Sequence, residues 1–156
     1  MIKRIWNLRH YLWFFIGMSK INVGLSRASI TSQLRKLDYT LPSSWEFCGL
    51  SQNGEDGIID VLASNIKKPS YMALEIGASN GIENCTSFLC IAKKYQTLMI
   101  EGDPKLAKRA KLILDHLQGS HEVINLLVTP ESINFLEGYS FMKKLDVFSL
   151  DIDSIE

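Results

Sequence analysis

The chain contains few of the residues that mark secreted, metal-binding or membrane-spanning proteins. Its 156 residues include only three cysteines and three histidines, with no C-x-x-C pair and no spacing typical of metal ligands. Within residues 1–20, the longest stretch without Lys, Arg or His runs from Tyr11 to Ser19. A helix needs roughly 20 apolar residues to span a bilayer. These features predict reduced thiols, no zinc site and a cytoplasmic compartment.

Acidic residues are absent from the first 37 positions, although the whole chain has 17 acids and 17 bases. This segment carries seven Lys or Arg, so the rest of the chain carries 10 bases and 17 acids, a net charge of −7. Aromatic residues are interleaved with the bases in residues 1–20. Such a helix can make peripheral contact with an anionic membrane, or its aromatic side can pack on the body, and we favour packing. The segment lacks acids and contains serines, so a transit peptide is also an alternative.

A linker is predicted between this basic arm and the rest of the chain. Residues 38–50 include Pro42 and two adjacent serines, which favour irregular structure. We therefore divide the chain into a helical arm with linker, residues 1–44, and a domain, residues 45–156.

Within the domain, short apolar runs alternate with helical patterns. Strands are predicted at residues 72–76, 97–101, 122–128 and 145–152, and helices at 51–67, after Gly81, at 103–119 and at 130–138. Ser51 or Asn53 is expected to cap the first helix, and Asp103 with Pro104 to begin the third. The alternation predicts an α/β fold, a parallel sheet with helices on both faces. Right-handed crossovers then place the carboxyl ends of the strands at one edge, where ligands bind.

Two glycines follow the first predicted strand, and an acid ends the second. Gly77 and Gly81 allow a sharp turn and a close approach of the backbone to a ligand. Glu101 lies 20 residues beyond Gly81, where a carboxylate can accept both ribose hydroxyls. With the free N–H groups of the following helix, this order predicts a pocket for an adenosine-containing cofactor. The alternative is a plain turn, with Glu101 capping the next helix.

The loop differs from the G-x-G-x-x-G pattern of dinucleotide-binding proteins. Ser79 stands where the middle glycine makes room for a pyrophosphate, which disfavours an NAD-dependent oxidoreductase. The pattern from Glu75 to Gly81, acid-x-Gly-x-x-x-Gly, instead resembles motif I of S-adenosylmethionine-dependent methyltransferases. Their cofactor has no phosphate, and nearby acids suit its positive charge.

Several further segments extend this resemblance over residues 45–156. They are SQNGEDGIIDVL, LEIGASNGIENCTSFL, LMIEGDP, VTPESI and DVFSLDID, and together they resemble the FkbM-type methyltransferases. The resemblance implies a Rossmann-like fold, the cofactor S-adenosyl-L-methionine, and methyl transfer to a hydroxyl of a sugar or polyketide-like acceptor. It also implies site residues: Glu75, Gly77, Ala78, Ser79 and Gly81 around the methionine end, Glu101 at the ribose, Asn125 to Leu127 near adenine, and Asp151 as the group that orients the acceptor hydroxyl or takes its proton.

The fold implied by the resemblance has seven strands in the order 3-2-1-4-5-7-6, and this sequence accounts for the first four. We therefore expect a truncated domain whose strand at 145–152 has an unpaired apolar edge, open to self-association. A non-catalytic remnant or partner-binding module is the alternative to an enzyme.

Charged residues could indicate two other partners, a metal ion and a nucleic acid. Asp151 and Asp153 form a D-x-D pair, but residues two apart on a strand stand roughly 6.5 Å apart, so we predict no metal site. The four bases of the helix at 103–119 are expected to face solvent rather than nucleic acid. The predicted partner is therefore a small-molecule or glycan acceptor.

Overall fold

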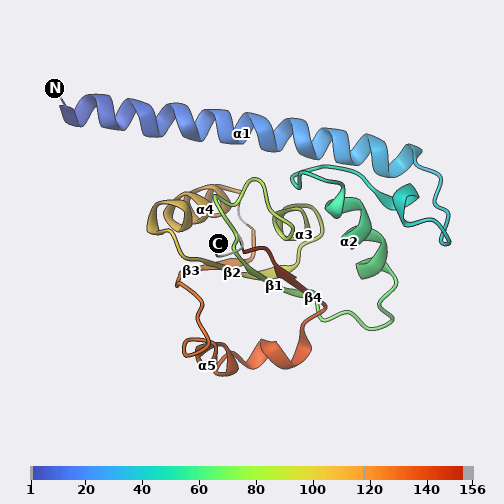
Figure 1. Ribbon diagram of the computed structural model, residues 1–156. Helices are drawn as coiled ribbons and strands as arrows, with labels where there is room; N and C mark the ends of the chain where they lie inside the picture. The colour runs from blue at the N-terminus through green and yellow to red at the C-terminus, as the bar shows by residue number, and fades with distance from the viewer. Residues whose placement is uncertain (1, 118, 153–156) are drawn as a thin grey trace.

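The computed structural model describes residues 2–117 and 119–152, and its centre is a parallel sheet of four strands (Figure 1). The strands are β1 (Met72–Ile76), β2 (Gln96–Glu101), β3 (His121–Asn125) and β4 (Val147–Leu150). Their order in the sheet is β3-β2-β1-β4, and every pair is parallel. The predicted α/β class with a parallel sheet is confirmed.

The register of the strands aligns their carboxyl ends. Ile76 at the end of β1 pairs with Ile100 of β2 and with Leu150 of β4. Glu101, the last residue of β2, pairs with Asn125, the last residue of β3. Four carboxyl ends therefore meet at one edge, and the order of the strands reverses between β1 and β4.

Helices cover both faces of this sheet, as predicted. They are α1 (Ile2–Leu34), η1 (Pro42–Trp45), α2 (Glu55–Ser64), α3 (Ser87–Ala92), α4 (Pro104–His116), α5 (Asn134–Glu137) and η2 (Ser140–Lys144). Figure 1 shows α3 and α4 on one side of the strands and α5 on the other. Leu74 and Ile100 pack toward Leu136 of α5, whereas Met99 packs toward Leu114 of α4.

The predicted start of α4 is confirmed, and its end is earlier than predicted. Asp103 is the N-cap, and its Oδ1 accepts hydrogen bonds from the N–H groups of Lys105 and Leu106 at 2.6 and 3.1 Å. Pro104 occupies the first turn, where its missing N–H costs nothing. The helix ends at His116, before Gly119.

The predicted cap of α2 is wrong. The N-cap is Gly54, whose φ of +91° begins the helix without a side-chain cap. Ser51 still accepts a hydrogen bond from the Asp56 N–H, at 3.0 Å, because the loop before the helix folds back over its first turn. Glu55 and Asp56 occupy that turn, as predicted.

β3 and β4 are shorter than the predicted strands. The Leu126 N–H donates to the Glu101 carbonyl at 3.0 Å, and the chain then leaves the sheet instead of continuing to Val128. β4 begins at Val147, after the predicted Leu145 and Asp146. The Asp146 side chain accepts hydrogen bonds from the N–H groups of Ser70 and Tyr71, before β1.

α1 is one continuous helix that crosses the body beside α3 and α4 (Figure 1). Four residues on one side of the helix, which we call the inner row, are buried against the rest of the chain: Gly17, Ile21, Gly24 and Ala28. Trp13 lies under the Arg109 guanidinium, 5.0 Å from its ring centroid. The arm packs on the body, but only part of its aromatic side does so: Trp13 and Phe14 are half-buried, whereas Tyr11 and Phe15 are exposed. None of the helices within residues 2–117 and 119–152 has the length and apolarity to cross a bilayer.

The close approach of α1 to the body generates the first prediction. A Cβ on Gly24 would lie 2.0 Å from the Gly49 carbonyl oxygen, so we expect Gly24→Ala to lower the free energy of unfolding by about 1–3 kcal/mol. Helix propensity alone predicts the opposite, a gain of about 1 kcal/mol. Urea denaturation distinguishes these outcomes, with exposed Ser26→Ala as control. A more stable Gly24→Ala variant would show that the two backbones are not in contact.

Candidate functional site

A cavity of about 620 Å³ lies at the carboxyl ends of β1, β2 and β4. Its floor includes Gly77, Glu101 and Asp151, each of which follows or ends a strand. Residues 51–55, which precede α2, form another wall, and residues 126–128 close the side beyond β2. The cavity thus occupies the point where the strand order reverses, a common ligand site in open parallel sheets.

The glycine loop turns sharply because two of its backbone positions leave no room for a side chain. Gly77 has a φ of +88°, and a Cβ there would lie 1.7 Å from the Asp151 carbonyl oxygen. Gly81 has a φ of +74°, and its Cβ would lie 2.9 Å from the Cα of Ala110 in α4. The two glycines therefore let the loop pass between β4 and α4.

The helix expected directly after this loop begins later than predicted. α3 starts at Ser87, six residues beyond Gly81, and has only six residues. The N–H groups of Cys85 and Thr86, just before it, donate to the Glu75 carboxylate. The Ser87 N–H at the start of α3 likewise donates to Asn84, and no residue of α3 lines the cavity, so the first turn of this helix does not face the site as expected.

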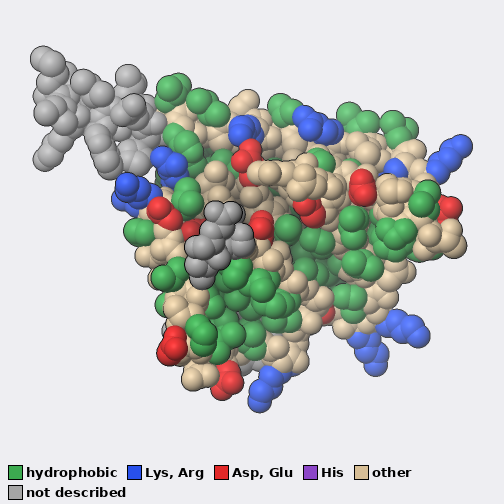
Figure 2. Space-filling view, viewed as in Figure 1, with side chains coloured by type: hydrophobic (Ala, Val, Ile, Leu, Met, Phe, Trp, Pro, Cys, Tyr) green, Lys and Arg blue, Asp and Glu red, His purple; other side chains and the backbone are tan. Residues whose placement is uncertain are grey.

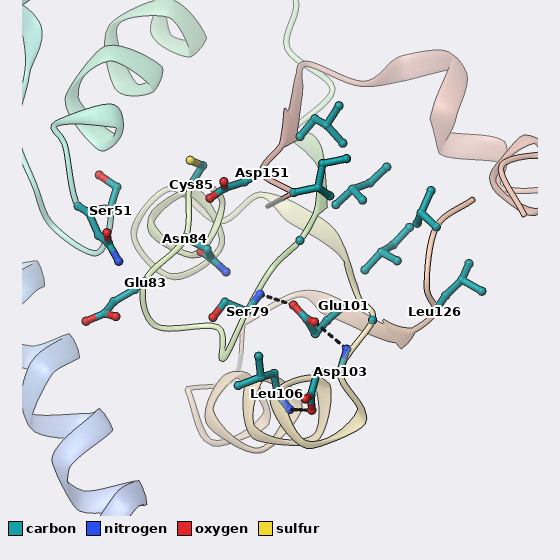
Figure 3. Close-up of a pocket in the computed structure, with 18 of the residues that line it drawn as sticks. Ser51, Ser79, Glu83, Asn84, Cys85, Glu101, Asp103, Leu106, Leu126 and Asp151 are labelled. Atoms are coloured by element: carbon teal, nitrogen blue, oxygen red, sulfur yellow. Dashed lines mark hydrogen bonds between the residues drawn. The ribbon is translucent and has the colours of Figure 1, made fainter. Parts of the chain in front are cut away.

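Glu101 connects the glycine loop to the start of α4. Its Oε2 accepts a hydrogen bond from the Ser79 N–H at 2.7 Å, and its Oε1 accepts one from the Asp103 N–H at 2.8 Å (Figure 3). A carboxylate oxygen can accept more than one hydrogen bond, so Glu101 retains capacity toward the cavity that it lines.

Glu75 lies beneath the cavity and does not line it. Its side chain is fully buried and accepts hydrogen bonds from the N–H groups of Cys85 and Thr86 at 2.9 and 3.1 Å, as well as from the Thr86 hydroxyl. Burial raises the pKa of Glu75, whereas these hydrogen bonds act to lower it. The structure therefore assigns Glu75 to positioning the loop that carries Cys85.

The other predicted site residues fall into two groups. Gly77, Ser79 and Asp151 line the cavity, whereas Ala78 and Gly81 are buried behind it. Asn125 lies at the end of β3, where its amide donates to the carbonyl oxygens of Glu101 and Gly102 at 2.8 and 3.0 Å. Its neighbours Leu126 and Leu127 line the cavity instead.

The wall formed by residues 51–55 was not predicted as part of the site. Asp56 holds it in place, because its Oδ2 accepts the N–H groups of Gly49, Leu50 and Ser51 at 2.7, 2.6 and 2.8 Å. Its Oδ1 is buried without a partner among the described residues, and burial raises the pKa of Asp56 against these hydrogen bonds. The polar run SQNGED is the sequence signal that could have indicated this wall.

Carboxylates dominate the charge of the cavity. Five acids line it: Glu55, Glu83, Glu101, Asp103 and Asp151. Among the described residues that line it, none is Lys, Arg or His. Glu83 is paired with a cation, since the Lys20 Nζ of α1 lies 2.7 Å from its Oε1. The other four acids favour a cationic ligand over an anionic one.

The cavity has a polar end and an apolar end. Figure 3 shows Ser51, Asn84, Cys85 and Asp151 together at one end and Leu126 at the other, with Glu101 between them. Leu106, Leu127 and Val128 also contribute to the lining. Such an arrangement fits a long ligand with one flat apolar group and one polar tail.

Cys85 at the polar end is a protonated thiol at neutral pH. Burial raises its pKa to about 11, and the Glu75 carboxylate adds to the shift, against a hydrogen bond with Ser149. All three cysteines are free thiols. Residues 2–117 and 119–152 contain no group of three His, Cys, Asp or Glu side chains placed to hold a metal, and Asp153 of the D-x-D pair lies outside the described residues.

Comparison of the chain with protein-family models, with curated proteins and with solved structures found no significant match.

The raised pKa of Cys85 generates the second prediction. Alkylation of Cys85 by iodoacetamide should accelerate about tenfold per pH unit between roughly pH 7.5 and 9.5 without levelling off, because only the thiolate reacts. In the urea-unfolded chain, the same cysteine should level off within that range. Peptide mapping by mass spectrometry measures both rates. A plateau in the folded protein below pH 9 would contradict the effect of burial.

Proposed function

We propose that the chain is a Rossmann-like domain of an S-adenosylmethionine-dependent methyltransferase that transfers methyl groups to a hydroxyl of a small molecule or glycan. The observation that carries this proposal is the cavity beside the glycine loop, which five carboxylates line without a Lys, Arg or His among its described residues. The strand order β3-β2-β1-β4 supports the fold assignment, since it places a reversal at the same cavity.

Charge distinguishes the two cofactor classes. S-adenosylmethionine has a net positive charge from its sulfonium and amino groups, whereas the pyrophosphate of NAD is negative. A unit charge 4 Å from a carboxylate interacts by roughly 1–4 kcal/mol at the dielectric constants of water and protein surfaces. Several carboxylates therefore favour the sulfonium and oppose the pyrophosphate, in agreement with Ser79 in the loop.

The two ends of the cavity match the parts of this cofactor. Leu106, Leu126 and Leu127 would hold the adenine, and Glu101 would accept hydrogen bonds from the ribose hydroxyls. The methionine part would lie at the polar end, where Gln52 can donate hydrogen bonds to a carboxylate. The chemistry of the lining residues therefore supports this cofactor, with apolar side chains at one end and polar ones at the other.

Asp151 is the residue in this arrangement that would act on the acceptor. When bound, S-adenosylmethionine supplies an electrophilic methyl group on a sulfonium. Asp151 lines the polar end and is exposed, so an acceptor hydroxyl can reach it. There it would orient the hydroxyl and accept its proton, while the bound cofactor would supply the methyl group from its sulfonium and leave as the neutral thioether. Gly77 lets the backbone at Asp151 lie close against the glycine loop, because any side chain at position 77 would collide with it.

Calorimetry tests the cofactor. S-adenosylmethionine should bind the 156-residue chain, and NAD should not. Glu101→Gln should weaken S-adenosylmethionine binding about tenfold or more. Each Glu101 oxygen accepts a backbone hydrogen bond, and the glutamine amide has only one oxygen that can accept. Glu137→Gln is the matched control, an exposed acid in α5. Tight NAD binding without S-adenosylmethionine binding would overturn the proposal.

A methyl-transfer assay tests Asp151 and separates an enzyme from a binding module. With sugars, glycans and hydroxylated small molecules as acceptors, Asp151→Asn should lower kcat about 100-fold while leaving cofactor affinity within about threefold of the wild type. Cofactor binding without methylation of any hydroxyl acceptor would instead indicate a non-catalytic module.

A further inference from the structure

α1 has a second apolar face that points away from the body. This outer row consists of Leu12, Ile16, Val23, Ile30 and Leu34, which are between 52% and 76% exposed. At 3.6 residues per turn, these side chains fall within an arc of about 40°. The row therefore runs along most of the helix on one side, and Tyr11 and Phe15 lie exposed beside it.

The outer row is not needed for the packing of α1 on the body. That packing uses the inner row on a different side of the helix, in which Ile21 and Ala28 are buried against Phe47, Leu50 and neighbouring residues. Figure 2 shows hydrophobic side chains at intervals along the upper border of the molecule, where α1 lies in Figure 1. Two apolar faces on one helix call for two partners, and among residues 2–117 and 119–152 the body covers the inner row but leaves the outer row exposed.

The charge around the outer row indicates the second partner. Residues 1–37 contain seven bases and no acid. Arg27 lies four residues after Val23 and three before Ile30, so it neighbours the outer row, and its side chain is exposed. Lys36 is exposed just beyond the end of the helix, whereas Lys20 is paired with Glu83 of the body at 2.7 Å. An apolar row flanked by bases is typical of helices that lie on anionic membranes.

A second copy of the chain fits this surface less well. Pairing two outer rows would bring two acid-free basic segments together, and like charges oppose such contact. An anionic bilayer attracts the same bases by about 1 kcal/mol each. The helix is straight and lies along the border of the molecule, with a length of about 50 Å, so a flat surface can contact the whole row (Figure 1).

We propose that the outer row of α1 binds the surface of a membrane that contains anionic lipids. The helix then lies in the interface with Leu12, Ile16, Val23, Ile30 and Leu34 among the headgroups, and the inner row holds the body against it. Lys20 of α1 binds Glu83 on the wall of the cavity at 2.7 Å, so membrane binding holds the cavity beside the bilayer. This inference does not depend on the reaction proposed above.

Flotation with lipid vesicles tests the proposal. The full chain should float with phosphatidylcholine vesicles that contain about 30% phosphatidylserine, less in about 0.5 M salt than in 0.1 M, and not with pure phosphatidylcholine. Val23→Gln/Ile30→Gln should weaken partitioning about tenfold or more. Leu62→Gln/Leu112→Gln is the matched control, because these apolar side chains on α2 and α4 are similarly exposed.

Circular dichroism checks that the variants remain folded, and light scattering measures whether the chain forms a dimer. Because Val23 and Ile30 are exposed, the double variant should keep its helix content and thermal transition. No flotation with anionic vesicles at low salt would overturn the proposal, as would equal losses from both double variants. A dimer that Val23→Gln/Ile30→Gln converts to a monomer, without vesicle binding, would assign the outer row to a second copy.

Discussion

Three carboxylates, Asp56, Glu75 and Glu101, hold the loops that surround the cavity. Each accepts hydrogen bonds from at least two backbone N–H groups; for Glu101 one comes from the glycine loop and the other from Asp103, two residues further along. Hydrogen bonds to charged groups contribute about 1.5–3 kcal/mol each, and a buried N–H without a partner costs about as much. Removal of any one of these side chains would therefore release a wall of the cavity. The shape of the site depends on this pattern more than on contacts between the walls themselves.

The same pattern accounts for the charge of the site. Carboxylates that accept backbone N–H groups are stabilised in place; among the acids that line the cavity, Glu55, Glu101 and Asp103 do so, whereas Glu83 pairs with Lys20. Glu101 belongs to both sets, because it fixes the glycine loop and faces the cavity. A cationic ligand would then neutralise the negative charge of the acids that line the cavity. This is the physical basis for choosing a sulfonium cofactor over a pyrophosphate.

α1 adds a separate constraint on the molecule. Its glycines, Gly17 and Gly24, bring the helix backbone close to the body, and Ile21 fills the space between them. The helix also ends in a strong anchor, since Arg35 binds Asp60 at 2.6 Å and stacks on Phe47. A helix held in this way keeps a fixed side toward the outside. Its outer row is therefore presented as a rigid strip, beside the wall that carries Glu83.

The sequence by itself determined the α/β class, the parallel sheet and the cap at Asp103, because apolar periodicity and capping are local signals, whereas the tertiary structure decided how α1 packs. Glycine and acid spacing also located the cavity at Gly77 and Glu101. Only the tertiary structure decided which side chains face it. Glu75 lies within a strand that pairs on both sides, so its carboxylate turns under the cavity toward Thr86. Residues 51–55 enter the site because Asp56 accepts hydrogen bonds from the backbone of residues 49–51, and the polar run SQNGED alone does not say where that loop lies.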